Sequence, residues 1–299
     1  MKILVSWLKE FVTVPHGPDG PVSIGALAEA LTTRGFEVGA IEPWPTTKDG
    51  AEDAVLDLEI TTNRPDCLSV LGIAREVGAM YDTEIAMPEL ASSDDVRGEA
   101  PLSITIDDPN WCPRYVGAVA NVEVGPSPQW LRTRLEAADV RPVNNVVDVT
   151  NYVMLEIGHP MHAFDHAQLA GPEIHVRRAA HGERIRTLDG VERTLTPETL
   201  TIADAERPQA VAGIMGGATS EINDGTRTLV LEAAYFDPIS VRRTSKRLSL
   251  TTDASYRFER GADVSAPVTA ISRALQLLTV IGAGRTRGPA VDCYPAPPD

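Results

Sequence analysis

Three of the six histidines lie in one stretch of eight residues, which begins at His159, contains His162 and ends at His166. Histidines spaced by three and four residues are typical of metal sites on helices. Pro160 opposes that interpretation, because a proline in the second place breaks a helix and favours a turn. The stretch therefore predicts no metal site, and its imidazoles remain candidates for acid–base chemistry or substrate positioning.

A second candidate is Glu232, the only carboxylate in the apolar run TLVLEAAYF. The run predicts a buried strand, and a buried carboxylate is costly unless it meets a partner or a polar ligand. Glu232 therefore either binds a ligand in a cavity or lies at an outward-facing position of the strand. Residues 212–217, AGIMGG, allow close approach of the backbone to a ligand, or alternatively form a bulge or tight turn.

Several other types of site are disfavoured. The sequence contains no Gly-x-Ser-x-Gly elbow and no Walker loop, and its three cysteines share no short spacing. We therefore expect neither a hydrolase triad nor a nucleotide loop nor a cysteine metal knuckle. The segment TTDASYRFERG is ambiguous, since its small residues and Phe258 either line a pocket or pack in a core.

The chain has 299 residues, 43% of them hydrophobic and 23% charged, which is typical of a globular protein with two domains. No apolar run is long enough to span a membrane and no signal peptide is evident, so we expect a cytoplasmic location. The net charge of −15 argues against general electrostatic coating of nucleic acid. One basic segment, SVRRTSKRL, is either an RNA contact or a solvated helix face.

The order of predicted elements indicates an α+β protein: a small N-terminal α+β domain followed by a larger mixed β-sandwich and α+β domain. The first domain is expected over residues 1–87, with a helix capped by Ser23 and another capped by Asp66. A polar linker is expected over 88–100. Strand patterns dominate 101–289, which ends with a helix at about 265–281, and the Pro-rich residues 290–299 are expected to be a linker to missing C-terminal domains.

Together these segments resemble the β subunit of bacterial phenylalanyl-tRNA synthetase, in its N-terminal domain and its B3/B4 editing module. The resemblance lies in SWLKEFV with RGFEV, LDLEITTNRPDCLSVLGIARE, RPVNNVVDVTNYVMLEIGHPMHAFD, GIMGG and LEAAYFDPISVRRTSKRLSLTTDASYRFERG. These five segments occur in the family's order and cover nearly the whole chain, which is far more specific than any one short motif.

The resemblance implies hydrolytic editing of tRNA(Phe) that is mischarged with tyrosine. An apolar pocket that selects phenylalanine rejects an added hydroxyl by only about 10²-fold, so tyrosine would escape the first selection. A second site that hydrogen-bonds the hydroxyl discriminates by about 10⁴ to 10⁵, because its polar group is otherwise left without a partner. By the family match, the carboxylate of Glu232 accepts the tyrosine phenol.

The same match implies the other site residues. The substrate-binding set is Glu232, Gly213, Ile214, Ala212, Ala254, Pro160 and Phe258. The residues expected near the scissile ester are His162, Thr252, Asn151 and Thr150, with His162 either positioning the attacking water or acting as a base. His159 and His166 are then expected at the surface.

Two departures from the family pattern affect the expected partners. The oligonucleotide-binding-fold insert that usually follows RGFEV is absent, and so are the later domains that contact the α subunit. The implied partners are tRNA(Phe), its mischarged Tyr-tRNA(Phe) form and the α subunit of a heterotetramer, with ATP and Mg²⁺ used elsewhere and no cofactor bound by this segment. Local charge suggests tRNA contacts at Arg141, Arg242, Arg243 and Lys246. The alternative function is a non-catalytic scaffold that binds tRNA or the α subunit.

Overall fold

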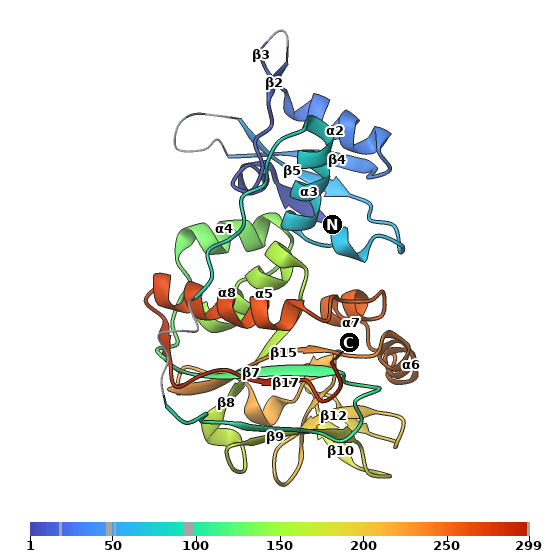
Figure 1. Ribbon diagram of the computed structural model, residues 1–299, viewed down its shortest axis with the longest axis vertical. Coiled ribbons are helices and arrows are strands. Elements are labelled where there is room, and N and C mark those ends of the chain that lie inside the picture. The colour runs from blue at the N-terminus through green and yellow to red at the C-terminus, as the bar shows by residue number, and fades with distance from the viewer. Residues whose placement is uncertain (18–19, 46–49, 51, 92–97, 298–299) are drawn as a thin grey trace.

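A computed structural model describes residues 1–17, 20–45, 50, 52–91 and 98–297. The predicted α+β class is confirmed, with helices and several separate sheets along the chain. Figure 1 shows the N-terminal elements at one end, a layer of helices in the middle and two β-sheets at the other end. No helix of the described residues is long and apolar enough to cross a membrane.

The N-terminal unit is a three-stranded antiparallel sheet of order β1-β5-β4 with two principal helices. Ser23 caps the first of these helices as predicted, accepting a hydrogen bond from Ala26 N at 3.2 Å. The cap of the second is Ser69 rather than Asp66, because Asp66 lies in a short 3-10 turn before the helix begins. The elements are β1 (Lys2–Leu4), α1 (Val5–Leu8), β2 (His16–Gly17), β3 (Gly20–Pro21), α2 (Ile24–Thr33), β4 (Val38–Trp44), β5 (Asp53–Leu58), η1 (Pro65–Cys67) and α3 (Val70–Tyr81).

The second unit is built on a central antiparallel sheet of order β16-β7-β15-β8, with β17 also paired to β7. Three helices cover one face of this sheet, and a second sheet packs on the other face (Figure 1). The strands are β7 (Arg114–Val122), β8 (Met161–Asp165), β15 (Thr228–Tyr235), β16 (Gly284–Thr286) and β17 (Val291–Cys293). The covering helices are α4 (Gln129–Ala137), α5 (Asn145–Ile157) and α8 (Ala266–Val280).

The second sheet has the order β14-β13-β12-β9-β6, in which β6 and β9 are parallel. A separate hairpin joins β10 to β11. Its turn contains Asp189-Gly190, a pair that the sequence alone marks as a hairpin turn, and Gly190 has φ +78°. The remaining elements are β6 (Ser103–Ile106), η2 (His166–Gln168), β9 (Glu173–Arg178), β10 (Arg184–Arg186), β11 (Glu192–Thr194), β12 (Leu200–Ala203), β13 (Pro208–Val211), β14 (Met215–Gly216), η3 (Ala218–Ser220), α6 (Pro238–Leu248) and α7 (Asp253–Phe258).

Alternation along β15 divides its side chains between two hydrophobic clusters. Leu229, Leu231 and Ala233 pack towards the helices, in a cluster that continues into the N-terminal unit. Val230 and Ala234 pack between the two sheets. The run TLVLEAAYF is apolar throughout because both faces of this strand are covered.

Both segments expected to be linkers contain residues that are hydrogen-bonded to the rest of the protein. Of residues 88–100, 92–97 lie outside the described part of the chain, and Ala91 N donates to Ser272 O at 3.1 Å. In the C-terminal segment, β17 pairs with β7, and Asp292 forms an ion pair with Arg114 at 2.6 Å. These residues form a strand rather than a linker because the edge of β7 offers unpaired backbone groups.

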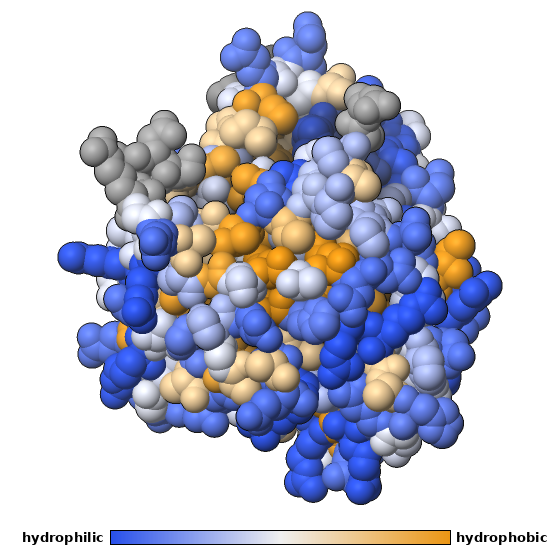
Figure 2. Space-filling model, turned by 60° about the horizontal axis from the view of Figure 1, so that its bottom comes forward, coloured by the Kyte–Doolittle hydropathy of each residue, from blue (hydrophilic) through white to orange (hydrophobic). Residues whose placement is uncertain are grey.

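One face of the molecule is largely polar (Figure 2). Figure 2 shows a face dominated by hydrophilic residues, with hydrophobic residues gathered in a limited area near its middle. An acidic chain with a net charge of −15 is expected to present such a surface.

Candidate functional site

Two predicted site residues lie directly opposite each other in the central sheet. Glu232 on β15 is the antiparallel register partner of His162 on β8. Opposed residues of antiparallel strands project from the same face, so the carboxyl and the imidazole share one side of the sheet. Val230 and Ala234, two positions away on either side of Glu232, define that side as the space between the two sheets.

A small cavity of about 70 Å³ lies on this face. Its walls come from β8, β12 to β15 and α7, and consist of Pro160, Met161, His162, Ile202, Ala210, Val211, Gly213, Ile214, Met215, Gly216, Glu232, Phe236, Ala254 and Phe258. The structure thus brings together seven residues predicted from the sequence: His162, Glu232, Pro160, Gly213, Ile214, Ala254 and Phe258. Small-molecule pockets usually measure about 300–1,000 Å³, so these walls must move apart to admit an aromatic side chain.

The Glu232 carboxyl is buried, with 5% of the residue exposed. Burial raises its pKa to about 8, and the neighbouring Tyr115 phenol opposes part of that rise. No hydrogen bond of regular geometry joins the two groups, and Oε2 of Glu232 has no partner among the described residues. At pH 7 the carboxyl is therefore mostly protonated, and it presents an O–H donor and a carbonyl acceptor rather than the charged carboxylate expected from the sequence.

The His162 imidazole is also neutral at pH 7, because burial lowers its pKa to about 4. Its ring packs edge-on against Phe164 with the centroids 4.6 Å apart, and Nε2 has no hydrogen-bond partner within the described part of the chain. A Cβ atom on Gly216 would lie 2.4 Å from both Cε1 and Nε2 of this ring. Glycine at position 216 therefore leaves the space that the imidazole occupies.

The buried titratable groups predict that the chain is most stable near pH 6.5. Burial lowers the pKa of His159 and of His162 from 6.5 to about 4, so between these values the unfolded chain binds more protons and stability falls as the pH falls. Each histidine accounts for about 3 kcal/mol across that window. Glu232 acts in the opposite direction: its pKa is raised from 4.5 to about 8, so stability falls as the pH rises through this range.

Equilibrium urea unfolding at intervals from pH 4 to pH 8.5 measures this dependence. Below pH 6.5 the two histidines outweigh Glu232, and above it only Glu232 of the three still titrates, so a maximum is expected between the two limbs. A free energy of unfolding that keeps rising from pH 6.5 to 8 would contradict the burial of the Glu232 carboxyl.

Thr150 and Asn151 are not among the residues that line the cavity. They lie on α5, whose buried residues Val149 and Val153 belong to the cluster on the opposite face of the central sheet. The hydroxyl of Thr150 donates to Val147 O at 2.7 Å within the helix. The structure therefore separates these two residues from the cavity wall by placing their helix behind the sheet, and their catalytic role stays a prediction.

Thr252 lies beside the cavity without lining it. Its hydroxyl donates to Ile214 O at 2.8 Å and accepts from Ser255 N at 3.1 Å, capping α7. Thr252 thus ties α7 to the loop of residues 212–217, and these are two walls of the cavity. Ala212 is buried next to Gly213 but does not contribute to the wall itself.

The expected surface position of His159 is wrong, since only 1% of the residue is exposed. The N-terminal unit covers the turn at 158–160. A Cβ atom on Gly158 would lie only 3.2 Å from Ser69 Cβ. His159 also packs edge-on against Phe258, with the ring centroids 5.9 Å apart. His166 lies in η2 and is partly exposed.

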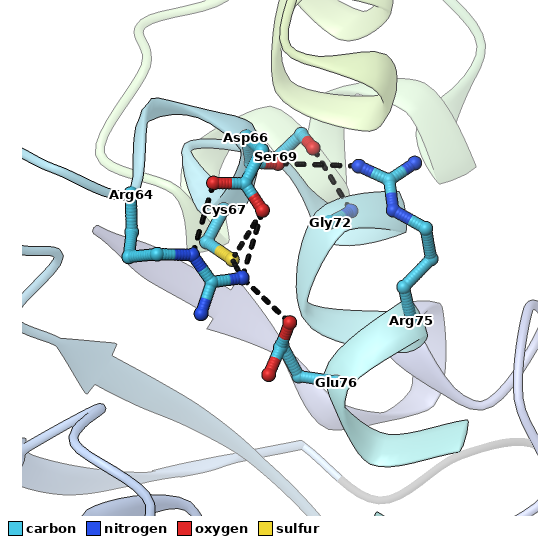
Figure 3. Close-up of polar contacts among 7 residues, drawn as sticks. All are labelled: Arg64, Asp66, Cys67, Ser69, Gly72, Arg75 and Glu76. Carbon is cyan, nitrogen blue, oxygen red and sulfur yellow. Dashed lines mark hydrogen bonds and ion pairs between the residues drawn. The ribbon is translucent and has the colours of Figure 1, made fainter. Parts of the chain in front are cut away.

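Among the described residues, one group of potential metal ligands lies close together: Asp66, Cys67 and Glu76. Figure 3 shows the guanidinium of Arg64 between these three side chains. Its Nη2 lies 2.8 Å from Asp66 Oδ2, 2.9 Å from Cys67 Sγ and 2.5 Å from Glu76 Oε1. Because Arg64 already supplies the cation, the cluster is a structural ion-pair network that holds the loop before α3.

The predicted tRNA-contacting residues of α6 form an exposed basic surface. Arg242, Arg243 and Lys246 are exposed, whereas Arg247 hydrogen-bonds Glu198 O at 3.1 Å and Thr199 Oγ1 at 2.9 Å. Arg141 is exposed in the loop after α4, next to Val140, which shares a pocket wall with Tyr256 of α7. Contact of the four predicted residues with tRNA stays a prediction.

Two residues at the site, Tyr115 and Gly216, are not among the site residues predicted from the sequence. Gly216 lies within the glycine-rich segment 212–217, and Tyr115 lies within a strand pattern. Both act through pairing with residues far along the chain, since Tyr115 lies diagonally across β7 and β15 from Glu232. The only available sequence pattern was the alternation of β7, which does not specify its register against β15.

Comparison with known proteins gives the family. Residues 111–283, more than half of the chain, match the B3/4 domain. The phenylalanine–tRNA ligase β subunit of Carboxydothermus hydrogenoformans is 52% identical over 292 residues, which cover 92% of this chain and 36% of that protein. The corresponding protein of Geobacter metallireducens is 50% identical over 253 residues, 83% of this chain and 31% of that protein.

The chain spans about a third of the length of these curated relatives. An N-terminal fragment of the phenylalanyl-tRNA synthetase β subunit from Pyrococcus horikoshii aligns with 15% identity and a TM-score of 0.43, covering 100% of this chain and 79% of that one. The chain therefore belongs to the B3/4 domain family and is similar over most of its length to phenylalanine–tRNA ligase β subunits.

Proposed function

We propose that this chain is the portion of a phenylalanine–tRNA ligase β subunit that hydrolyses tyrosine wrongly esterified to tRNA(Phe). The observation that supports the proposal most directly is the uncharged Glu232 carboxyl, buried in an apolar cavity beside His162. Its carbonyl oxygen accepts the phenol proton of tyrosine, whereas a phenylalanine ring would leave the carboxyl without a partner. The cavity therefore selects the amino acid that differs by one hydroxyl.

His162 contributes to hydrolysis by positioning water in this proposal. A group whose pKa is about 4 is a weak general base at pH 7, because general-base catalysis is most effective when the pKa lies near the operating pH. A neutral imidazole still has one N–H donor and one lone pair, which suffice to orient a water molecule against the ester carbonyl. The water oxygen bonds to the ester carbonyl carbon, and the bond between that carbon and the ribose oxygen breaks. One proton of the water passes to the ribose oxygen, which leaves free tyrosine and tRNA.

The direct test incubates the purified chain with Tyr-tRNA(Phe) and Phe-tRNA(Phe) and follows release of the amino acid. We expect faster release of tyrosine, and the same rate with and without a chelator. Loss of activity with the chelator would instead favour a metal-dependent hydrolysis. No release of either amino acid, combined with measurable tRNA binding, would support the non-catalytic scaffold function.

Replacement of His162 by alanine distinguishes the two roles of the imidazole. We expect a loss of less than about tenfold in the deacylation rate, which is below the roughly 10² to 10⁴ that general-base catalysis contributes. The measurement is the single-turnover rate at saturating chain concentration between pH 6 and 8. A loss of more than 10²-fold would assign base catalysis to His162.

The basic face of α6 is the proposed tRNA contact. A triple change of Arg242, Arg243 and Lys246 to glutamine should weaken tRNA binding and make the plot of log K against log salt concentration shallower by about one unit for each phosphate that is no longer neutralised. Arg186→Gln on the β10–β11 hairpin is the matched control, because it removes one exposed charge elsewhere. Filter binding from 50 to 300 mM salt measures both slopes, and an unchanged slope in the triple variant would exclude this face.

We further propose that the α subunit and tRNA(Phe) are partners of the full-length β subunit, and that ATP and Mg²⁺ act in that assembly rather than on this segment. The names of the relatives, which are β subunits of a phenylalanine–tRNA ligase, support the two proposed partners. The chain alone is accordingly expected to form no Phe-tRNA from phenylalanine, ATP and tRNA.

A further inference from the structure

A second, larger pocket of about 320 Å³ lies at the junction of the N-terminal unit and the B3/4 unit. The N-terminal unit supplies the loop before α3 and one residue of α3 itself, and the B3/4 unit supplies the turn after α5, the end of α7 and the start of α8. The wall consists of Pro65, Asp66, Arg75, Ile157, Gly158, His159, Arg257, Gly261, Ala262, Asp263 and Ala266. Its volume lies at the lower end of the range usual for small-molecule sites.

Arg257 is a buried guanidinium with incomplete charge compensation. The residue is only 5% exposed, and its side chain donates from Nε to Leu68 O at 3.3 Å and from Nη1 to Asp253 Oδ1 at 3.1 Å. The Asp253 side chain is 68% exposed, so water screens this ion pair. Nη1 also donates to Asp253 O at 3.1 Å, whereas Nη2 donates no hydrogen bond within the described part of the chain. Arg257 lines this pocket and also a neighbouring one beside Leu68 and Tyr256, so Nη2 is the group of this buried guanidinium that is left for a ligand.

Arg75 supplies a second guanidinium on the other side of the pocket. It reaches back over the start of α3, where Nη2 donates a long hydrogen bond of 3.4 Å to the backbone carbonyl of Asp66 (Figure 3). The Asp66 carboxylate does not neutralise Arg75, because it is held by Nε and Nη2 of Arg64 at 3.0 and 2.8 Å. Arg75 is exposed and has no ion pair among the described residues.

One further feature of the wall is the buried imidazole of His159. The residue is 1% exposed, and neither ring nitrogen makes a hydrogen bond of regular geometry in the described residues, although burial lowers its pKa and the backbone of Ala234 lies near enough to oppose part of that fall. The 15-residue helix α8 begins at Ala266 on the wall, where Ala266 N donates to Asp263 O at 3.1 Å. The other carboxylate of the wall, Asp263, accepts a hydrogen bond from Ser265 N at 2.7 Å in the turn before α8.

We propose that this interface pocket binds a small ligand through an oxyanion group, a phosphate or a carboxylate, held between Arg257 and Arg75. A guanidinium binds such groups with paired, charge-assisted hydrogen bonds, and a partly buried one does so most strongly because less water competes. The bound group also offsets the cost of burying Arg257. The ligand is larger than the oxyanion itself, since the cavity has room for an organic portion beside Pro65 and Ile157.

The pocket shares a wall with the cavity of Glu232 but does not depend on the function proposed for it. Along the turn after α5, His159 lines the interface pocket and Pro160 lines the other cavity. On α7, Arg257 lines the interface pocket and Phe258 lines the cavity of Glu232. A ligand held by Arg257 therefore lies on the far side of a wall of the Glu232 cavity. This wall must shift before that cavity can admit an aromatic ring.

Isothermal titration of the full chain tests the proposal with four probes: inorganic phosphate, phenyl phosphate, acetate and benzoate, each at constant ionic strength in chloride. We expect one-to-one binding of either phenyl phosphate or benzoate, more tightly than of the small anion of the same class. Binding of phenyl phosphate would identify the ligand as a phosphate, and binding of benzoate would identify it as a carboxylate. Arg75→Gln should weaken that binding at least tenfold. Arg186→Gln, which removes an exposed arginine from β10, should leave it unchanged.

Arg257→Lys keeps the charge but removes the planar pair of donors, and it too should weaken binding at least tenfold if the variant folds. Circular dichroism establishes folding, and Arg75→Gln alone decides the matter if Arg257→Lys does not fold. The proposal is overturned if no probe binds above the chloride background, or if the Arg75→Gln chain binds the probe as tightly as the unmodified chain.

Discussion

Replacement of Glu232 by alanine should bring the deacylation rates of the tyrosyl and phenylalanyl esters of tRNA(Phe) together. Apart from His162, which positions the water in the proposed function, the side chains of the cavity wall are apolar, so Glu232 supplies the hydrogen bond that distinguishes the two rings. Sites that bind a substrate hydroxyl discriminate by about 10⁴ to 10⁵, and we expect at least about 10² of this to be lost. Single-turnover deacylation of both esters at pH 7 measures the ratio.

Glu232→Gln is the matched control for this change. Glutamine keeps a carbonyl acceptor of the same length but cannot ionise, so part of the tyrosine preference should survive. The preference of the unmodified chain should change above pH 8, where the carboxyl loses its proton, whereas that of the Gln variant should stay constant. An alanine variant that retains the full preference would show that the phenol is recognised elsewhere.

Replacement of Gly72 by alanine should destabilise the chain by about 3 kcal/mol or more, at the upper end of the usual cost of overpacking. A Cβ at this position would lie 2.1 Å from Asp66 O and 2.9 Å from Cys67 Cα, both of them backbone atoms. Figure 3 shows Gly72 at the start of α3, directly beneath the loop that Arg64 and Ser69 hold. The loop has little freedom to move, because the Gly72 amide also donates to Ser69 Oγ at 2.9 Å.

Gly25→Ala provides the comparison, since the nearest atom to its Cβ would be Ser23 Oγ at 4.0 Å. This substitution in the first turn of α2 should leave the free energy of unfolding unchanged or raise it by up to about 1 kcal/mol. Urea titrations of the three proteins at pH 7 give the differences. Equal stability of the Gly72→Ala and Gly25→Ala chains would mean that the loop before α3 can shift freely.

Local patterns in the sequence were sufficient for much of the fold. The cap at Ser23, the hairpin turn at Gly190 and the buried strand around Glu232 follow from residue types a few positions apart, and the structure contains each of them. The α+β class follows from the order of such segments, and the family follows from long motifs in sequence. These features depend on local backbone preferences and on periodicity, both of which are properties of a short stretch of chain.

The errors occurred where contacts between distant segments decide burial or pairing. His159 was expected at the surface because GHP is a typical exposed turn, yet the N-terminal unit covers it. Residues 291–293 have the composition of a linker, but they pair as a strand with the open edge of β7. The catalytic role of Thr150 and Asn151 stays a prediction, and the structure shows only that the helix that carries them packs on the other side of the sheet from the cavity.

The sequence by itself determined which residue types were available for chemistry: one carboxyl in an apolar strand, one imidazole after a turn, and glycines nearby. Only the tertiary structure decided that Glu232 and His162 are register partners, that both are uncharged at pH 7, and that Arg257 and Arg75 face a common pocket. The reason is physical. Register between strands 70 positions apart and the loss of solvent around an ionisable group arise only when distant segments pack together, and local sequence encodes neither.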